Sequence, residues 1–342
     1  MKNVFPKITI ITPSYNQGSY IEETIDSVLS QNYPNLEYMI FDGGSSDNTV
    51  EVIRKYEKNL NFWVSERDNG QSDAINKGLR IASGDIVNWL NSDDYYEPNC
   101  LNIIGKQFEN SNVSAVCGRS NLFKGAREVV GESSGTDVYR NNLAKTIGWS
   151  RIDQPATFFR KTALDQMGLL AVDLHYVMDK EWWIRYLLLY GLNNIKKIEA
   201  KLVNFRLHES SKTTTQIDLF GLETASIFFN IAKTIGEMEL AQLIVDTEDL
   251  KEDLKIQLTS TFLLEKKVLL KNALHHYLLH RADYYYSIDE RGAAQSYLNF
   301  IHRDCLNYDE QSLLLNLKLR NRILPIWIKN RKLKLFNHAN IS

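Results

Sequence analysis

LEYMIFDGGSSDNTVEVI, residues 36–53, contains a complete strand-to-helix transition, and it decides the fold. The first six residues are mostly apolar and aromatic, which favours a buried strand. Asp42 follows directly. A turn of glycine, serine and asparagine comes next, and then an apolar pattern typical of a helix. The segment therefore predicts a strand with Asp42 at its carboxyl end.

The same transition recurs on both sides of this segment. Strands are predicted at 8–12, 36–41, 61–65 and 85–90, with helices between them that Ser19 and Ser72 would cap. Alternation of strands and helices implies a parallel sheet with right-handed crossovers. We therefore expect an α/β fold with a Rossmann-type, mostly parallel sheet flanked by helices.

Four polar loops follow the predicted strands. They begin at Pro13, Asp42, Asp68 and Asn91. Ligands of open α/β sheets bind beyond the carboxyl ends of the strands, so these loops should meet at one edge. A single loop aspartate is usually a turn residue. Aspartates after three successive strands indicate a binding site.

Composition excludes several classes of function. The chain has 342 residues and a formal net charge of −2, which gives no electrostatic case for nucleic acid. Its three cysteines are far apart, which predicts neither a zinc site nor a disulfide framework. The first residues lack the pattern of a signal peptide, and no apolar run is long enough to span a membrane. We expect a cytoplasmic protein.

The distribution of glycine and proline predicts two domains. Fourteen of the 17 glycines precede residue 216, and five of the six prolines lie at or before Pro155. We expect a mixed α/β domain over 1–215 and a helical domain over 216–342. The last part, 316–342, is basic, amphipathic and free of acids. It suits either peripheral contact with an anionic membrane or a solvated helix packed on the domain.

LNSDDYY, residues 90–96, places two carboxylates side by side. Neighbouring carboxylates repel, so one tends to stay protonated unless a cation joins them. Mg²⁺ and Mn²⁺ prefer oxygen ligands and accept phosphate oxygens as partners. Asp93 and Asp94 are therefore candidate ligands of a divalent cation. The pair could also precede a helix that begins near Pro98.

Two blocks of the chain resemble family 2 glycosyltransferases. They are TIITPSYNQGSYIEETIDSVLSQNYPNLEYMIFDGGSSDNT and DNGQSDAINKGLRIASGDIVNWLNSDD, and the resemblance covers roughly residues 7–215. It implies the GT-A fold and inverting transfer of a sugar from a nucleotide-diphosphate donor with a divalent cation, Mn²⁺ or Mg²⁺. It further implies a UDP-sugar donor, a saccharide or lipid-linked saccharide acceptor, and a role in bacterial surface polysaccharide synthesis on the inner face of the plasma membrane.

The resemblance also assigns residues. It places Thr12, Pro13, Ser14 and Tyr15 around the nucleoside, Asp42 on the uracil ring, and Asp73 and Lys77 near the base and diphosphate. Asn91, Ser92 and Asp93 occupy the D-x-D position and Asp94 follows it, so Asp93 and Asp94 are the expected metal ligands. His208 matches a late histidine that approaches the metal or diphosphate. Asp179 matches the catalytic base, with Glu181 as the reserve candidate, and one of Trp182 and Trp183 is expected to line the acceptor cleft.

The chain departs from the family pattern at two positions. Asn91 stands where the first D-x-D aspartate is expected, and Met178 precedes Asp179 where a glutamate is expected. An amide oxygen can still ligate a hard cation. Two rival functions remain open. The first is a glycosyltransferase-like binding module without turnover. The second is a nucleotidyltransferase, although the loop after the first strand, TPSYNQGSY, lacks the basic residues that a triphosphate requires.

Overall fold

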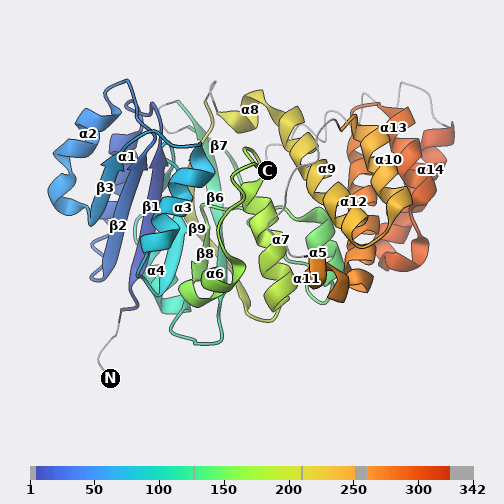
Figure 1. The fold of residues 1–342 in the computed structure, drawn as a ribbon, viewed down its shortest axis with the longest axis horizontal. Helices are drawn as coiled ribbons and strands as arrows, with labels where there is room; N and C mark the ends of the chain where they lie inside the picture. The colour runs from blue at the N-terminus through green and yellow to red at the C-terminus, as the bar shows by residue number, and fades with distance from the viewer. Residues whose placement is uncertain (1–4, 126–127, 209–210, 251–259, 324–342) are drawn as a thin grey trace. The chain divides into compact units, whose positions relative to one another are not determined.

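The computed structural model describes residues 5–125, 128–208, 211–250 and 260–323 (Figure 1). The chain divides into two compact units. Unit 1 comprises residues 1–136 and 152–217, and unit 2 comprises residues 137–151 and 218–342. The chain therefore leaves unit 1 for one short segment, returns, and enters unit 2 finally at residue 218. The early excursion at 137–151 was not predicted, because no change in composition marks it.

Unit 1 is built on a mixed sheet with the strand order β3-β2-β1-β4-β8-β6-β9-β5, and β7 pairs with β6. The strands are β1 (Ile8–Ser14), β2 (Leu36–Asp42), β3 (Phe62–Ser65), β4 (Ile86–Trp89), β5 (Tyr95–Tyr96), β6 (Ala115–Lys124), β7 (Glu128–Glu132), β8 (Thr157–Arg160) and β9 (Ile195–Arg206).

The first four strands confirm the predicted parallel sheet. β1 pairs in parallel with both β2 and β4, and β2 pairs in parallel with β3. The other half of the sheet has a different pattern. β8 runs antiparallel to β4 and β6, whereas β6 and β9 are parallel. Short strands with few β-branched residues, such as β8, carry too weak a period to be predicted from the sequence.

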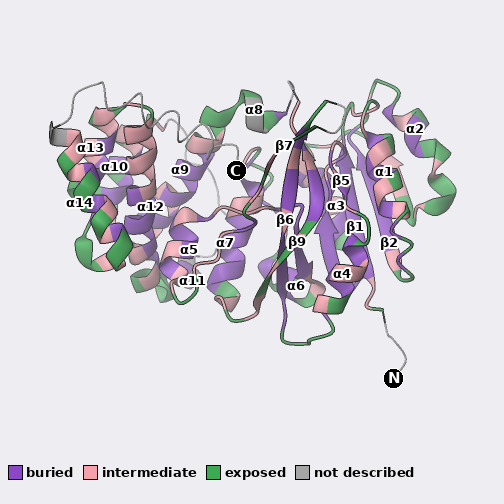
Figure 2. Ribbon diagram, turned by 180° about the vertical axis from the view of Figure 1, so that it is seen from behind, coloured by how far each residue is buried: buried purple, intermediate pink, exposed green. Residues whose placement is uncertain are grey.

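Helices cover the sheet of unit 1 (Figure 1). They are α1 (Ile21–Leu29), α2 (Thr49–Lys55), α3 (Gln71–Ile81), α4 (Cys100–Gln107), α6 (Lys161–Met167), α7 (Met178–Tyr190) and α8 (Lys212–Thr215), with a 3₁₀ turn at Glu57–Asn59. The main core lies between the β1, β2 and β4 strands and helices α1 and α4. It is formed by fully buried residues such as Ile10, Ile25, Ile40, Ile86 and Ile104. Figure 2 shows these strands as buried almost throughout.

The predicted helix caps are wrong. α1 begins one residue later than a Ser19 cap requires, because Tyr20 precedes its first residue and makes no side-chain cap bond. Ser72 lies inside α3, which Gly70 precedes with a positive φ of 99°. The Ser72 hydroxyl instead donates to the Leu174 carbonyl at 3.2 Å, so it ties α3 to the loop before α7.

Unit 2 is helical over the residues that the structure describes, as predicted for 216–342. Its helices are α5 (Leu143–Trp149), α9 (Ile217–Thr234), α10 (Met238–Glu248), α11 (Ser260–Glu265), α12 (Lys267–Ser287), α13 (Arg291–Phe300) and α14 (Tyr308–Ile323), with a 3₁₀ turn at Arg303–Cys305. No helix in the described ranges is long and apolar enough to cross a membrane. The predicted basic segment lies outside the described residues from position 324 onward.

Helix α5 packs closely on α12 through Gly148. A Cβ atom at this position would lie 2.5 Å from the Ala273 carbonyl oxygen and 2.6 Å from the His276 Cβ, so only glycine fits. Glu310 of α14 fixes the same region, because its carboxylate lies 2.9 Å from His276 Nδ1 and 3.5 Å from the Lys145 ammonium. The excursion at 137–151 is therefore an integral part of unit 2.

Glu37 lies at the start of β2, at the amino-terminal ends of the parallel strands of unit 1. Its carboxylate accepts hydrogen bonds from the Lys7 ammonium at 2.7 Å, the Thr9 hydroxyl at 2.6 Å and the Ser83 backbone at 2.8 Å. Burial alone would raise the pKa of Glu37, but these bonds to the charged form outweigh it and lower the pKa from 4.5 to about 2.

We expect Glu37→Gln to lower the free energy of unfolding at neutral pH by about 2 kcal/mol. This figure is below the full value of the pKa shift, because water around the partly exposed Lys7 screens its interaction with Glu37. The depressed pKa means that this stabilisation is complete above pH 4.5 and is lost as the pH falls from 4.5 toward 2. Denaturant unfolding of both proteins across that range tests this. A gap between the two proteins that stays constant down to pH 2 would contradict it.

Candidate functional site

The carboxyl ends of β1, β2 and β4 lie at one edge of the sheet of unit 1. Ser14 is in register with Asp42, and the Leu90 amide donates to the Ile11 carbonyl at 2.9 Å. The loops that follow these strands begin at neighbouring points, because parallel strands end at the same edge. The predicted meeting of the polar loops after β1, β2 and β4 is thus present in the structure.

The loops after β1 and β2 are joined by hydrogen bonds. The Asn16 amide donates to the Ser45 hydroxyl at 2.7 Å, and the Gly18 amide donates to the Asp47 carboxylate at 3.0 Å. Asn16 has a positive φ of 52°, which asparagine tolerates better than most residues. The joined loops leave the Tyr15 ring exposed, as expected for a residue that would meet a nucleobase.

Ser14 and Thr12 differ in their availability to a ligand. The Ser14 hydroxyl is buried, and it has no hydrogen-bond partner within the described part of the chain. A buried polar atom without a partner is costly, so it is a candidate contact for a bound molecule. Thr12 is fully buried, and its hydroxyl lies 3.1 Å from the Tyr38 hydroxyl. Thr12 therefore stabilises the strand that carries Pro13 and Ser14.

Asp42 organises the turn that follows β2. Its Oδ2 accepts bonds from the Gly44 amide at 3.1 Å, the Ser45 amide at 2.9 Å and the Ser65 hydroxyl at 2.6 Å. The side chain is buried. These bonds mean that the carboxylate builds the loop that would surround a base. The predicted direct bond from Asp42 to uracil stays a prediction.

Asp68 begins one of the polar loops that the sequence predicts at this edge, although no individual role was assigned to it. Its carboxylate lies against Gly43, where a Cβ atom would be 2.8 Å from Oδ2. Gly43 therefore leaves space for the Asp68 side chain at the end of β2. Burial raises the pKa of Asp68, and the charges of Asp73 and Asp42 act in the same direction. The DGG turn was the available signal, because a glycine after a strand often marks a close approach.

Asp73 and Lys77 belong to one charged group on α3. The Lys77 ammonium lies 2.8 Å from the Glu66 carboxylate and 3.9 Å from that of Asp73. Asp73 also accepts a bond from the Asn69 amide at 3.1 Å, which fixes the turn before the helix. Hydrogen bonding to Glu66 is the main reason why the pKa of Lys77 is raised, so Lys77 remains charged.

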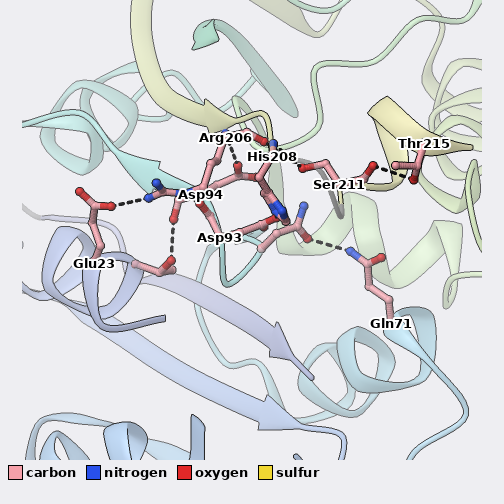
Figure 3. A network of polar contacts seen from close by, with 10 residues as sticks. Glu23, Gln71, Asp93, Asp94, Arg206, His208, Ser211 and Thr215 are labelled. Atoms are coloured by element: carbon pink, nitrogen blue, oxygen red, sulfur yellow. Dashed lines mark hydrogen bonds and ion pairs between the residues drawn. The ribbon is translucent and has the colours of Figure 1, made fainter. Parts of the chain in front are cut away.

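Asp93 and His208 come together from distant parts of the chain (Figure 3). His208 Nε2 lies 3.0 Å from Asp93 Oδ2, and both side chains are partly accessible. The His208 backbone amide bonds to the Ser211 hydroxyl at 3.1 Å, which fixes the turn after β9. A carboxylate oxygen and an imidazole nitrogen thus lie within hydrogen-bond distance of each other beside the D-x-D position.

Asp94 is placed differently from Asp93. It is buried, and its Oδ1 accepts the Arg206 backbone amide at 2.9 Å. Its Oδ2 has no hydrogen-bond partner among the described residues. Burial, followed by the charge of Asp93, raises the pKa of Asp94 well above its usual value. Its burial and its bond to Arg206 let Asp94 support the loop, and its role as a metal ligand stays a prediction.

Arg206 clamps the loop that carries both aspartates (Figure 3). Its Nε donates to the Asp93 carbonyl at 2.9 Å, and its guanidinium pairs with Glu23 of α1. The guanidinium also lies over the ring of Phe123, 4.5 Å from its centre, and over that of Tyr20. The predicted set omitted Arg206, although it stands two residues before His208 in the printed sequence.

Asn91 and Ser92 complete the D-x-D position. Asn91 Oδ1 accepts a bond from the Gln71 side chain at 2.8 Å, and Ser92 is buried. Gln71 lies at the start of α3 and is also 3.4 Å from the Lys212 ammonium, which donates to the His175 carbonyl at 3.0 Å. The segment after His208 is thereby linked to the loop that precedes α7.

Asp179 lies in the first turn of α7 and is partly exposed. The helix is positioned by Trp182, whose ring centre lies 5.2 Å from that of Trp89 in β4 and whose Nε1 donates to the Gly168 carbonyl. Trp89 directly precedes the segment that carries Asn91 and Asp93. The rigid packing of Trp182 therefore fixes the start of α7 on a strand that leads into the site.

The two other expectations for α7 are not supported by the structure. Glu181 is buried, and its carboxylate pairs with Arg185 at 2.7 Å, so it is unavailable to an acceptor hydroxyl. Trp182 and Trp183 are both fully buried. The expectation that one of them lines an acceptor cleft is wrong, because the aromatic rings around Phe159 enclose both.

The residues at the D-x-D position fit a divalent cation with few protein ligands. Asp93 and His208 supply one oxygen and one nitrogen donor, and Mn²⁺ accepts both types. Among the described residues, no group of three or more His, Cys, Asp or Glu side chains is arranged to enclose a metal. This suits an ion whose remaining ligands come from phosphate oxygens and water.

Residues 9–168 match the family described as Glycosyl transferase family 2. This part of the chain belongs to glycosyltransferase family 2. A relative of this glycosyltransferase, an uncharacterised glycosyltransferase of Rickettsia typhi, is 24% identical over 263 residues, which are 73% of this chain and 79% of the relative. The putative teichuronic acid biosynthesis glycosyltransferase TuaG of Bacillus subtilis is 39% identical over 104 residues, 30% of this chain and 41% of TuaG.

A solved structure shares the fold of this family 2 glycosyltransferase. TarS of S. aureus, residues 1–349 in complex with UDP, superposes with a TM-score of 0.56 at 16% identity and covers 92% of this chain and 88% of that one. The GT-A-like fold expected from the sequence is thereby confirmed.

Proposed function

We propose that this glycosyltransferase moves a sugar from a UDP-sugar to a saccharide or lipid-linked saccharide, with inversion and with help from Mn²⁺ or Mg²⁺, in bacterial surface polysaccharide synthesis. The observation that carries the proposal is the pairing of Asp93 with His208 at the edge of the sheet where β1 and β2 end. The similarity to TuaG, a putative teichuronic acid biosynthesis enzyme, and to TarS in complex with UDP supports the role in polysaccharide synthesis and the nucleotide.

Each group of residues has a distinct role in this proposal. Tyr15, Ser14 and the Asp42 turn would hold the nucleoside, and Asp68 would face the same pocket from the end of β3. Asp93 and His208 would hold the cation, which as a Lewis acid offsets charge on the leaving diphosphate. Asp73 and Lys77 would fix the turn at the start of α3, next to the base and diphosphate.

Asp179 would act as the general base. The acceptor hydroxyl must lose a proton as its oxygen attacks the anomeric carbon from the face opposite the leaving group. A partly exposed carboxylate at a fixed helix start can accept that proton. One base suffices for inversion, because no covalent enzyme intermediate forms.

A donor screen tests the proposal. Nucleotide release from UDP- and GDP-sugars would be measured with Mn²⁺, with Mg²⁺ and with chelator. We expect a UDP-sugar to be turned over only with a divalent cation. Binding without any release would favour the rival binding module, and pyrophosphate release from a nucleoside triphosphate would favour a nucleotidyltransferase.

Asp42→Ala is expected to weaken UDP binding more than it slows transfer. The change removes the acceptor for Gly44, Ser45 and Ser65, so the turn that surrounds the base loosens. A loss of about 1–3 kcal/mol in binding corresponds to lost hydrogen bonds at one buried acceptor. Calorimetry of UDP binding measures it. An unchanged affinity, in a variant with native circular dichroism, would count against the nucleoside site.

We also propose that the enzyme works at the cytoplasmic face of the membrane, with peripheral contact through residues 316–342. The sequence of this segment combines seven Lys and Arg residues with apolar side chains and no acid. Such segments bind anionic lipid surfaces.

A further inference from the structure

Helix α14 of unit 2 has apolar side chains on two opposite faces. Leu314 and Leu317 are buried against the rest of the unit, and the Asn321 amide donates to the Gln295 side chain of α13 at 3.0 Å. On the other face, Tyr308, Leu315 and Leu319 are 82%, 48% and 56% exposed. Figure 2 shows exposed residues along this helix.

The three exposed residues form one line along the helix. Their spacing of seven and four residues keeps them within about 20° of one direction, because an α-helix turns by about 100° per residue. We name Tyr308, Leu315 and Leu319 the outer stripe. Single exposed apolar residues are common on protein surfaces, whereas an aligned set on a helix that is already packed on its other side is a candidate binding face.

The charged residues near the carboxyl-terminal end of the outer stripe are all positive. Lys318 and Arg320 flank Leu319, and the sequence contains no Asp or Glu after Glu310. Glu310 itself is buried and pairs with His276 at 2.9 Å, so it does not offset these cations at the surface. The sequence that follows the stripe therefore carries cations and no acids.

We propose that the outer stripe of α14 is the element that docks onto an anionic lipid surface. Apolar side chains enter the boundary between headgroups and acyl chains, and neighbouring cations meet the lipid phosphates. A second copy of this chain that paired in parallel would bring two cationic ends together, whereas an anionic surface meets these cations with opposite charge. The inference extends the membrane contact proposed above and is independent of the transfer chemistry.

Vesicle binding by the full-length protein tests the inference. The variant L315S/L319S would be compared with the unaltered protein on phosphatidylglycerol–phosphatidylcholine vesicles at low salt. We expect its affinity to fall roughly tenfold or more, because two exposed leucines no longer enter the lipid. The matched control is V268S/I288S, which removes two apolar side chains that are 78% and 49% exposed in the same unit. It should bind like the unaltered protein.

Four outcomes would overturn the inference. Unchanged binding by L315S/L319S would exclude the stripe, and a chain truncated after residue 323 that alone loses binding would assign the contact to the last residues instead. Equal binding to pure phosphatidylcholine would remove the role of charge. A dimer in light scattering that L315S/L319S abolishes would assign the stripe to a second copy. Transfer to a soluble acceptor, measured in parallel, separates these results from a failure of the proposed enzymatic function.

Discussion

Asp93→Asn should reduce transfer by at least about a hundredfold, whereas Asp94→Asn should leave most activity in place. The two residues are adjacent, but their surroundings differ. Asp93 faces His208 Nε2 at 3.0 Å and is partly accessible, while Asp94 is buried and accepts the Arg206 amide. An asparagine at position 93 keeps the shape and loses the charge that a divalent cation requires. At position 94 it keeps an oxygen that accepts the Arg206 backbone amide, so the support of the loop is preserved.

Two measurements are needed to test this difference. Nucleotide release gives the rate, and Mn²⁺ binding followed by electron paramagnetic resonance in the presence of UDP gives the affinity for the ion without turnover. Equal loss in both variants would mean that Asp94 also ligates the cation, as the sequence alone suggests. Full activity of the unaltered enzyme in excess chelator would exclude a role for the metal altogether.

Asp179→Asn is expected to slow transfer by roughly 10²–10⁴-fold while UDP and Mn²⁺ affinities stay nearly unchanged. The amide has the shape of the carboxylate but cannot accept the acceptor's proton at neutral pH. Trp182 holds the start of α7 through contacts that the substitution does not alter. The loss should therefore appear in the transfer step alone.

The structure also supplies the controls for this experiment. Asp173→Asn changes an exposed acid in the loop before α7 and should transfer normally. Glu181→Gln breaks a buried pair with Arg185, so it should lower the stability of the protein and spare the chemistry. If Glu181→Gln is folded and inactive while Asp179→Asn is active, the base is Glu181. Normal transfer by both variants would make the start of α7 purely structural.

Local patterns predicted the first half of the sheet and the positions of its loops. β1 to β4 are runs of apolar residues that end in polar turns, so their positions along the chain and their carboxyl ends follow from the sequence. β8 and β9 could not be predicted in the same way, because their partners lie far away in the chain. The joining of His208 to Asp93 depends on that distant pairing, and only the family resemblance indicated it.

The different states of Asp93 and Asp94 could not be predicted either. Both follow the same strand, and a periodic pattern does not say which of two adjacent side chains a later strand will bury. Arg206 decides this, because its backbone amide binds one carboxylate and its side chain binds the carbonyl of the other residue. The burial of Glu181 has a similar cause, since Arg185 lies one helical turn away and its guanidinium pairs with the Glu181 carboxylate.

The packing of α5 on α12 also determines which fragments of this protein can be made. Residues 137–151 are synthesised long before α12. Ile147, which is fully buried in the folded protein, therefore stays exposed to solvent while the rest of unit 1 is synthesised. A chain ended at residue 215 would keep that apolar helix and lack its partner, which favours aggregation. A well-behaved catalytic fragment therefore requires an internal deletion, with residues 137–151 replaced by a short polar linker, as well as a new carboxyl terminus.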